Sequence, residues 1–169
     1  MSNYFNLEKS FGFYGAYHSE STNQWIHITC VPMIFATSIE LLNRFAPFIV
    51  LQLLLAFYIV SFIVMETTAG VLYAPLLLSY FYIGTKVLPE YPMLSLSLWI
   101  FSWIAQFVGH GVFEKRAPAL LKNLPQSLHA AVFFVWLEIL FKLGYKPELQ
   151  KKLEAAVAQE RKKFTASDQ

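Results

Sequence analysis

Long apolar stretches alternate with short polar segments along most of this 169-residue chain. A helix needs about 20 largely apolar residues to cross the roughly 30 Å hydrocarbon core of a bilayer. Five stretches approach that length, and we interpret each as a hydrophobic membrane segment. They cover residues 23–42, 47–65, 67–87, 91–113 and 125–143.

Two flanking segments have helical periodicity instead. Residues 6–17 place Leu7, Phe11 and Tyr14 at helical spacing, which predicts a short helix lying at the membrane interface. Residues 148–164 place Leu149, Leu153 and Val157 on one stripe with lysines elsewhere, which predicts an amphipathic C-terminal helix. The sequence therefore predicts an all-α, polytopic membrane helical bundle. We divide it into a transmembrane helical domain at 1–147 and a C-terminal amphipathic helix and tail at 148–169.

Composition supports a membrane protein. The hydrophobic fraction is 56% and the mean hydropathy is +0.46, above the roughly 45–50% apolar share of soluble domains. A soluble domain of this size has too much surface for its volume to bury so many apolar side chains, so we expect the lipid bilayer to cover them. The net charge of +2 argues against nucleic acid as a partner. With Cys30 as the single cysteine, the chain has no intramolecular disulfide.

The basic residues predict an orientation in the membrane. The loop after the fourth segment carries Lys115, Arg116 and Lys122, which the positive-inside rule places in the cytoplasm. The first twenty residues lack an apolar signal region, so the first hydrophobic segment is expected to direct insertion. Counting back through four segments places the N-terminus in the cytoplasm, but a full fifth crossing would place the lysine-rich tail outside. We therefore expect one segment to be re-entrant or broken, with both termini cytoplasmic.

Four histidines, His18, His27, His110 and His129, fall at helix ends that this topology places at the cytoplasmic face. Imidazole is the commonest metal-binding side chain and suits iron, zinc and copper. A turn over residues 19–23 allows His18 and His27 to converge. Histidines at a headgroup boundary also occur there simply as amphipathic side chains, so the metal site and the interfacial interpretation both stay open.

Three further polar residues are candidates for the same site. Glu114 lies four residues after His110, so on an α-helix both can point at one ion or substrate, although His110 can also cap the helix end. Glu138, inside the fifth segment, can pair with Lys142 or support a metal-bound histidine. Asn23 can cap the first segment while its amide orients a neighbour.

These residues belong to motifs that resemble a known family. The first motif has Tyr17-His18, Asn23, Ile26-His27 and Pro32. The second, more specific, reads QFVGHGVFEKR over residues 106–116, followed by Pro118-Ala-Leu and Asn123-Leu. The third covers residues 134–141 with Glu138. Together they are similar to the family of the fungal endoplasmic-reticulum 2-hydroxy fatty acid dioxygenase, which also has many bacterial members, and the likeness extends over about residues 7–146.

The resemblance implies an Fe(II)-dependent membrane dioxygenase that cleaves 2-hydroxy fatty acids with O2 to fatty acids one carbon shorter. This is fatty acid α-oxidation, which serves phytosphingosine degradation in fungi. The resemblance implies the endoplasmic reticulum membrane for a eukaryotic chain and the inner membrane for a bacterial one.

By motif, His18, His27 and His110 correspond to iron ligands, and Glu114 to a ligand or a supporting catalytic group. His129 has no counterpart in the family, and is an extra ligand or an interfacial residue. Lys122 stands where an acidic residue is common.

This chemistry fits the residue types. A 2-hydroxy acid offers a carboxylate and an adjacent hydroxyl that can chelate iron, while histidine ligands leave positions open for O2. Lys115 or Arg116 can attract the substrate carboxylate, or can serve only to orient the protein in the membrane.

Two alternatives belong to other functional classes. One is a non-catalytic scaffold or small transporter with structural histidines, although the second and third segments hold few polar residues for a transport path, namely Ser61, Thr67, Thr68 and Ser79. The other is a different metal-dependent lipid enzyme. Desaturase-type sites use more than the four histidines present here, and a serine hydrolase would need a nucleophile elbow that the sequence lacks.

Overall fold

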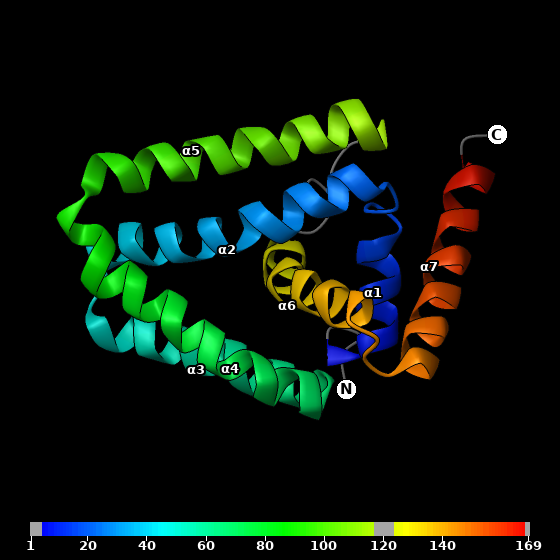
Figure 1. Cartoon of the computed structure of the whole chain (residues 1–169), viewed down its shortest axis with the longest axis horizontal. Helices are drawn as coiled ribbons and strands as arrows, with labels where there is room; N and C mark the ends of the chain where they lie inside the picture. The colour runs from blue at the N-terminus through cyan, green and yellow to red at the C-terminus, as the bar shows by residue number, and fades with distance from the viewer. Residues whose placement is uncertain (1–4, 117–123, 168–169) are drawn as a thin grey trace. The chain divides into compact units, whose positions relative to one another are not determined.

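The computed structural model describes residues 5–116 and 124–167, and every regular element within these ranges is a helix (Figure 1). The α-helices are α1 (Leu7–Gly15), α2 (Ser21–Asn43), α3 (Phe48–Met65), α4 (Thr67–Tyr82), α5 (Pro92–Val108), α6 (Leu124–Lys142) and α7 (Pro147–Ser167). The π-helical segments η2 (Ile83–Val87) and η4 (Gly109–Glu114) extend α4 and α5, and a 3-10 turn, η3 (Leu88–Glu90), follows η2. The all-α prediction is confirmed.

Four helical stretches are long and apolar enough to cross a membrane. They are Ser21–Asn43, Phe48–Met65, Thr67–Glu90 and Pro92–Glu114, and they correspond to the first four predicted segments. The fifth predicted segment is α6, which carries Glu138 and Lys142 and is not one of the four. The chain is therefore a polytopic helical membrane protein.

The described residues form two compact units. The first combines the chain up to Ile28 with the chain from Val108 onward, and the second covers residues 29–107. Helix α2 passes from the first unit into the second. The predicted boundary between residues 147 and 148 falls inside the first unit.

In the second unit, α3 and α4 form a close helical hairpin, visible side by side in Figure 1. Gly70 allows the close approach, because a Cβ there would lie 2.5 Å from the backbone nitrogen of Ile63. Glu66 separates the two helices and caps α4 by accepting a hydrogen bond from the Ala69 amide at 2.6 Å. The hairpin buries Phe62 and Leu77 completely.

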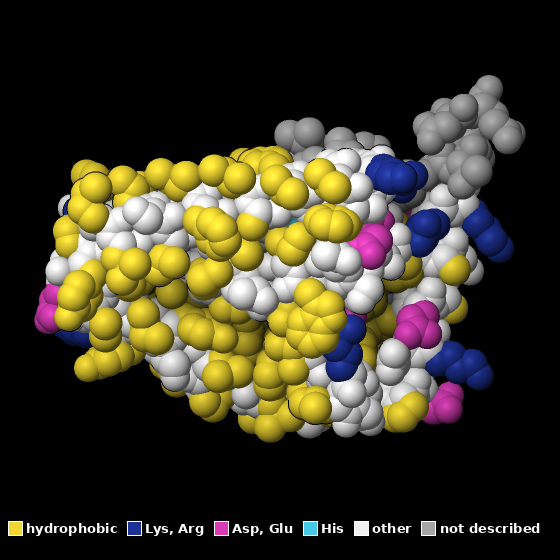
Figure 2. Space-filling model, turned by 45° about the horizontal axis from the view of Figure 1, so that its top comes forward, with side chains coloured by type: hydrophobic (Ala, Val, Ile, Leu, Met, Phe, Trp, Pro, Cys, Tyr) yellow, Lys and Arg dark blue, Asp and Glu magenta, His cyan; other side chains and the backbone are white. Residues whose placement is uncertain are grey.

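The outward faces of α3, α4 and α5 are apolar. Figure 2 shows apolar side chains covering much of the visible face of these helices. Large exposed side chains include Val64 at 66% and Met93 at 73% exposure. Such extensive apolar exposure fits contact with lipid, because soluble proteins rarely present contiguous apolar patches of this kind.

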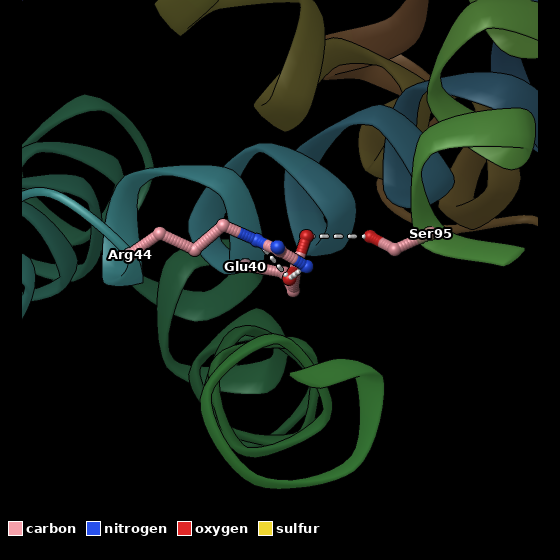
Figure 3. A network of polar contacts seen from close by, with 3 residues as sticks. All are labelled: Glu40, Arg44 and Ser95. Atoms are coloured by element: carbon pink, nitrogen blue, oxygen red, sulfur yellow. Dashed lines mark hydrogen bonds and ion pairs between the residues drawn. The ribbon is translucent and has the colours of Figure 1, made fainter. Parts of the chain in front are cut away.

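A buried carboxylate lies inside the first membrane-spanning helix, and the sequence interpretation did not single it out. The Glu40 side chain is 0% exposed and forms an ion pair with Arg44, one turn later on α2. The Ser95 hydroxyl, from α5, donates to the other Glu40 oxygen at 2.9 Å (Figure 3). Trp99 of α5 also donates to Ser38 of α2 at 3.1 Å. These polar contacts join α2 to α5 within the second unit.

In the first unit, α1 packs along α7. Gly12 and Gly15 make this possible, because added Cβ atoms would lie 3.2 Å from Ala156 Cβ and 2.5 Å from Val157 Cγ2. Leu153, from the predicted apolar stripe, is 1% exposed. The C-terminal amphipathic helix therefore covers one side of α1.

Helix α6 also packs against α1 in this unit. The ring of Phe11 lies 5.1 Å from the ring of Phe134 and 6.0 Å from the ring of Phe141, centroid to centroid, in edge-on geometry. Phe134 and Phe141 both lie on α6. Helices α6 and α7 thus hold α1, which ends three residues before His18.

The Glu40 network generates a stability prediction. Arg44→Ala is expected to lower the free energy of unfolding by about 2 kcal/mol, because it leaves a buried carboxylate without its cation. This is below the roughly 3–5 kcal/mol of fully buried pairs, since the Arg44 side chain is 41% exposed. Denaturant unfolding in detergent measures the change, with Arg44→Lys as the charge-retaining control. Equal stability of Arg44→Ala and the wild type would contradict a structural role for the pair.

Candidate metal centre

Three of the four histidines come together in the first unit. Among the described residues, His18, His27 and His110 form a group whose candidate ligand nitrogens all lie within 4.8 Å of one another. Their ring centroids are 4.4, 4.8 and 4.9 Å apart, and the rings are nearly perpendicular to one another. All three are at most 5% exposed. The predicted convergence of His18 and His27 across the turn between them is confirmed.

Backbone carbonyls fix the orientation of two of these rings. The Nδ1 of His18 lies 2.8 Å from the Tyr14 carbonyl, and the Nδ1 of His27 lies 2.9 Å from the Asn23 carbonyl. A carbonyl oxygen only accepts hydrogen bonds, so each Nδ1 carries the proton and each Nε2 keeps its lone pair. This is the arrangement in which proteins present histidine to a metal.

Burial favours the uncharged form of His18, the form that can bind a cation. Burial lowers the pKa of His18 well below its ordinary value, and His27 and His110 nearby lower it further. The Tyr14 ring stacks on the His18 ring with centroids 3.8 Å apart. A neutral, oriented imidazole is the form that binds a metal ion.

The donor set fits a transition metal. Among the residues that the structure describes, the buried Nδ1 of His110 has no hydrogen-bond partner. Buried polar atoms without a partner are rare unless an ion or water completes their hydrogen bonding. Three neutral nitrogens suit iron, zinc or copper, whereas calcium and magnesium prefer oxygen ligands. The cluster is therefore a candidate transition-metal centre.

A π-helical segment carries His110. Segment η4 begins at Gly109, directly before His110, and ends at Glu114; the next residue, Lys115, has a left-handed φ of 52°. The backbone amides of Lys115 and Arg116 both donate to the His110 carbonyl. Single π-helical turns occur frequently at functional sites.

Glu114 does not join the three histidines. Its carboxylate accepts hydrogen bonds from the Ser19 amide and hydroxyl, the Glu20 amide and the Asn23 side-chain amide. Glu114 and His110 lie in the π-helical segment η4 rather than in the α-helix that the sequence interpretation assumed. The carboxylate points to the start of α2.

Asn23 is not the cap of α2. The helix begins at Ser21, and the Glu20 side chain takes the capping position by accepting from the Asn23 amide at 2.9 Å. The capping prediction for Asn23 is therefore wrong, because an upstream carboxylate reaches the same free amide. The Asn23 side chain is instead fully buried, and its Nδ2 donates to Glu114 at 3.2 Å.

His129 lies outside the three-histidine group, although it is 4% exposed. Burial lowers its pKa to about 4, so this histidine is neutral near pH 7. It is positioned on α6, the helix that packs against α1.

Glu138 lines a pocket beside His18. The pocket has a volume of about 220 Å³, and burial raises the pKa of Glu138 while the charge of Lys142 lowers it. The Lys142 ammonium lies over the Trp25 ring at 5.1 Å. The pocket is lined by Phe11, Gly15, His18, Ser19, Gln24, Glu138, Phe141, Gln150, Glu154 and Val157.

The basic motif residues are only partly described. The Arg116 guanidinium lies over the Tyr17 ring at 5.9 Å, and Lys115 ends the π-helical segment through its backbone. Lys122 and the Pro118 and Asn123 positions of the second motif lie outside the described residues.

Sequence reasoning missed several supporting residues, namely Tyr14, Ser19 and Glu20. A local signal existed for the first of these. Tyr14 precedes His18 by four residues, just as Asn23 precedes His27, and this spacing places a carbonyl within reach of the ring. Ser19 and Glu20 can be identified as supporting residues only from their hydrogen bonds to Glu114, which lies more than 90 residues away in the sequence.

The fold and the site together define a class: a polytopic all-helical membrane protein with a buried three-histidine cluster. The chain matches the sequence profile of a family described as "Mpo1-like: 2-hydroxy-palmitic acid dioxygenase Mpo1-like" over residues 4–143. It is 40% identical over 156 residues to the Saccharomyces cerevisiae protein named 2-hydroxy-palmitic acid dioxygenase MPO1, covering 88% of each chain. The chain therefore belongs to the Mpo1-like family, which confirms the resemblance. No solved structure matches it.

The close approach at Gly109 gives a prediction with a matched control in the same segment. A Cβ at Gly109 would lie 2.5 Å from Asn23 Oδ1, whereas a Cβ at Gly111 would meet nothing within 4 Å. Gly109→Ala is expected to lower stability by about 1–3 kcal/mol through overpacking and to reduce the metal bound per chain. Gly111→Ala is expected to change neither. Thermal unfolding and metal analysis measure both variants, and identical behaviour of the two would contradict the close packing.

Proposed function

We propose that this protein is an Fe(II)-dependent membrane dioxygenase that cleaves 2-hydroxy fatty acids with O2 to fatty acids one carbon shorter. The observation that carries the proposal is the buried three-histidine cluster in a chain whose yeast relative is named 2-hydroxy-palmitic acid dioxygenase. In this proposal His18, His27 and His110 would hold ferrous iron. Iron held there would supply the Lewis-acid and one-electron chemistry that O2 activation requires.

The protein contributes orientation and exclusion of water. Carbonyl contacts hold His18 and His27 with Nε2 available, and three protein ligands leave coordination positions for exogenous groups. The substrate carboxylate and 2-hydroxyl are groups suited to those positions. We assign Lys115 and Arg116, at the end of η4, the role of attracting the carboxylate, and Glu138 a supporting role at the pocket beside His18.

The proposed reaction balances without a separate reductant. The bond between the carboxyl carbon and the hydroxyl-bearing carbon breaks. Oxidation of the hydroxyl-bearing carbon to a carboxyl group and of the former carboxyl carbon to CO2 releases four electrons, and one O2 accepts all four. One 2-hydroxy acid and one O2 then give one shortened fatty acid, one CO2 and one water. The proposal therefore requires neither a nicotinamide nor a flavin cofactor.

The four apolar helices support a location at one face of a membrane. An even number of crossings returns the chain to its starting side, so the residues before α2 and those after η4 lie on the same face. The histidines of the cluster lie at or beside these two points of the chain, since His18 precedes α2, His27 lies within its first two turns and His110 lies in η4. We propose that this face is cytoplasmic, following the basic residues after η4, in the endoplasmic reticulum of a eukaryote or the inner membrane of a bacterium.

The proposal is tested with purified protein in detergent, loaded anaerobically with ferrous iron and exposed to 2-hydroxypalmitate in air. We expect pentadecanoic acid, with one O2 consumed per acid formed. His18→Ala, His27→Ala and His110→Ala are each expected to reduce product to background, because each removes a proposed ligand. His129→Asn is expected to keep the metal stoichiometry of the wild type.

Several results would count against the proposed activity. Iron-loaded protein that consumes no O2 and retains stoichiometric zinc would favour another metal-dependent lipid enzyme. Protein that binds no metal and forms no product would favour a scaffold or transporter with structural histidines.

A further inference from the structure

We propose that Glu114 is not a metal ligand but a positioning residue that holds the three histidines of the cluster close together. Its carboxylate would connect the segment that contains His110 to the residues between His18 and His27 through hydrogen bonds. The inference rests on the proposed function only in taking the cluster as the metal site. It concerns the affinity of that site for a metal rather than the reaction.

The hydrogen bonds of the carboxylate leave no room for a metal ion. A carboxylate has about four lone-pair sites, and four donor groups occupy those of Glu114. The Ser19 hydroxyl donates to Oε1 at 2.6 Å and the Ser19 amide approaches both oxygens at 3.1 Å. The Glu20 amide and Asn23 Nδ2 donate to Oε2 at 3.0 and 3.2 Å. A metal bound to Glu114 would have to displace some of these donors.

The same contacts reach every segment that carries a histidine of the cluster. Ser19 directly follows His18, and Asn23 holds the His27 ring through its carbonyl while its side-chain amide binds Glu114. Glu114 is the last residue of η4, the segment that contains His110. One carboxylate therefore connects the three parts of the chain that carry the histidines of the cluster.

The Asn23 side chain links the same parts from the opposite direction. Its Oδ1 faces Gly109, where a Cβ would be only 2.5 Å away, and its Nδ2 binds Glu114 at the other end of η4. Asn23 is 0% exposed, and its hydrogen bond to Glu114 is partly buried. The η4 segment thus contacts the first turn of α2 at both of its ends, by close packing at Gly109 and by a hydrogen bond at Glu114.

Two physical effects strengthen this connection. Hydrogen bonds to an ionised carboxylate are about twice as strong as those between neutral groups. The Ser19 and Glu20 amides lie at the start of α2, where the helix macrodipole favours a negative charge. These effects favour a carboxylate over a neutral amide at position 114.

The test is a metal titration of Glu114→Gln. The glutamine keeps the size of the side chain and one accepting oxygen, but its NH2 group cannot accept the bonds that the second oxygen receives. We expect the dissociation constant for Co(II) to rise about 10- to 100-fold, the range seen when residues that orient metal ligands are changed. Titration of metal-free protein in detergent, followed by the visible absorption of Co(II), measures this constant.

The Co(II) spectrum separates positioning from ligation. If Glu114 only positions the histidines, Glu114→Gln saturated with Co(II) has the same absorption spectrum as the saturated wild type. If Glu114 is a ligand, the saturated spectrum changes because the donor set changes, and the proposal is overturned. An unchanged dissociation constant in Glu114→Gln would also overturn it.

Two further variants complete the design. Ser19→Ala removes one donor to the carboxylate and is expected to weaken Co(II) binding about fivefold, which keeps the proposal testable if Glu114→Gln fails to fold. Glu66→Gln is the matched control, because Glu66 also accepts a backbone amide at a helix start but lies in the other unit. It is expected to lower the thermal midpoint and leave Co(II) affinity unchanged. Loss of Co(II) affinity in this control equal to that in Glu114→Gln would show a general stability effect and refute the positioning role.

The result is independent of catalysis. Wild-type protein that binds Co(II) through the histidines but does not shorten 2-hydroxypalmitate would refute the proposed dioxygenase and leave the role of Glu114 intact. Wild-type protein that binds no Co(II) would refute the positioning role, whatever the outcome of the activity assay.

Discussion

Two hydrogen bonds from imidazole Nδ1 atoms to backbone carbonyls determine what the centre of this protein can do. His18 and His27 each donate to the carbonyl four residues earlier, so the remaining nitrogen of each ring keeps its lone pair. Burial then removes the water that would otherwise satisfy these nitrogens. The cluster is consequently a set of neutral donors held close together, and this arrangement supports the interpretation of the site as a metal centre.

Two carboxylates, the buried Glu40 and the partly buried Glu114, are stabilised in different ways. Glu40, inside α2, pairs with an arginine one turn away and accepts from a serine of α5. Glu114 accepts from two backbone amides, a hydroxyl and a side-chain amide instead. A cation beside Glu114 would place a positive charge near the cluster and oppose metal binding. Neutral donors introduce no such positive charge. Stabilisation by neutral donors therefore suits a carboxylate that lies near a metal site.

Family membership and site geometry answer different questions. The Mpo1-like family assignment identifies the chemistry performed by a relative at 40% identity. The geometry identifies which side chains are assembled, and it separates His129 from the other three histidines. The two agree on His18, His27 and His110, the three positions where the motif and the structure coincide. For Glu114, the motif alone left ligation open, and the hydrogen bonds favour a supporting role.

The sequence by itself determined the helical class, the first four of the five predicted membrane segments and the apolar stripe of α7, because hydropathy and periodicity are local properties. It also identified the three clustered histidines through their motifs. Only the tertiary structure decided that His129 lies outside the cluster and that Glu114 turns toward Ser19. The physical reason is that both outcomes depend on contacts between segments distant in the sequence, whereas the capping of α2 by Glu20 is a local contact that the sequence interpretation did not weigh.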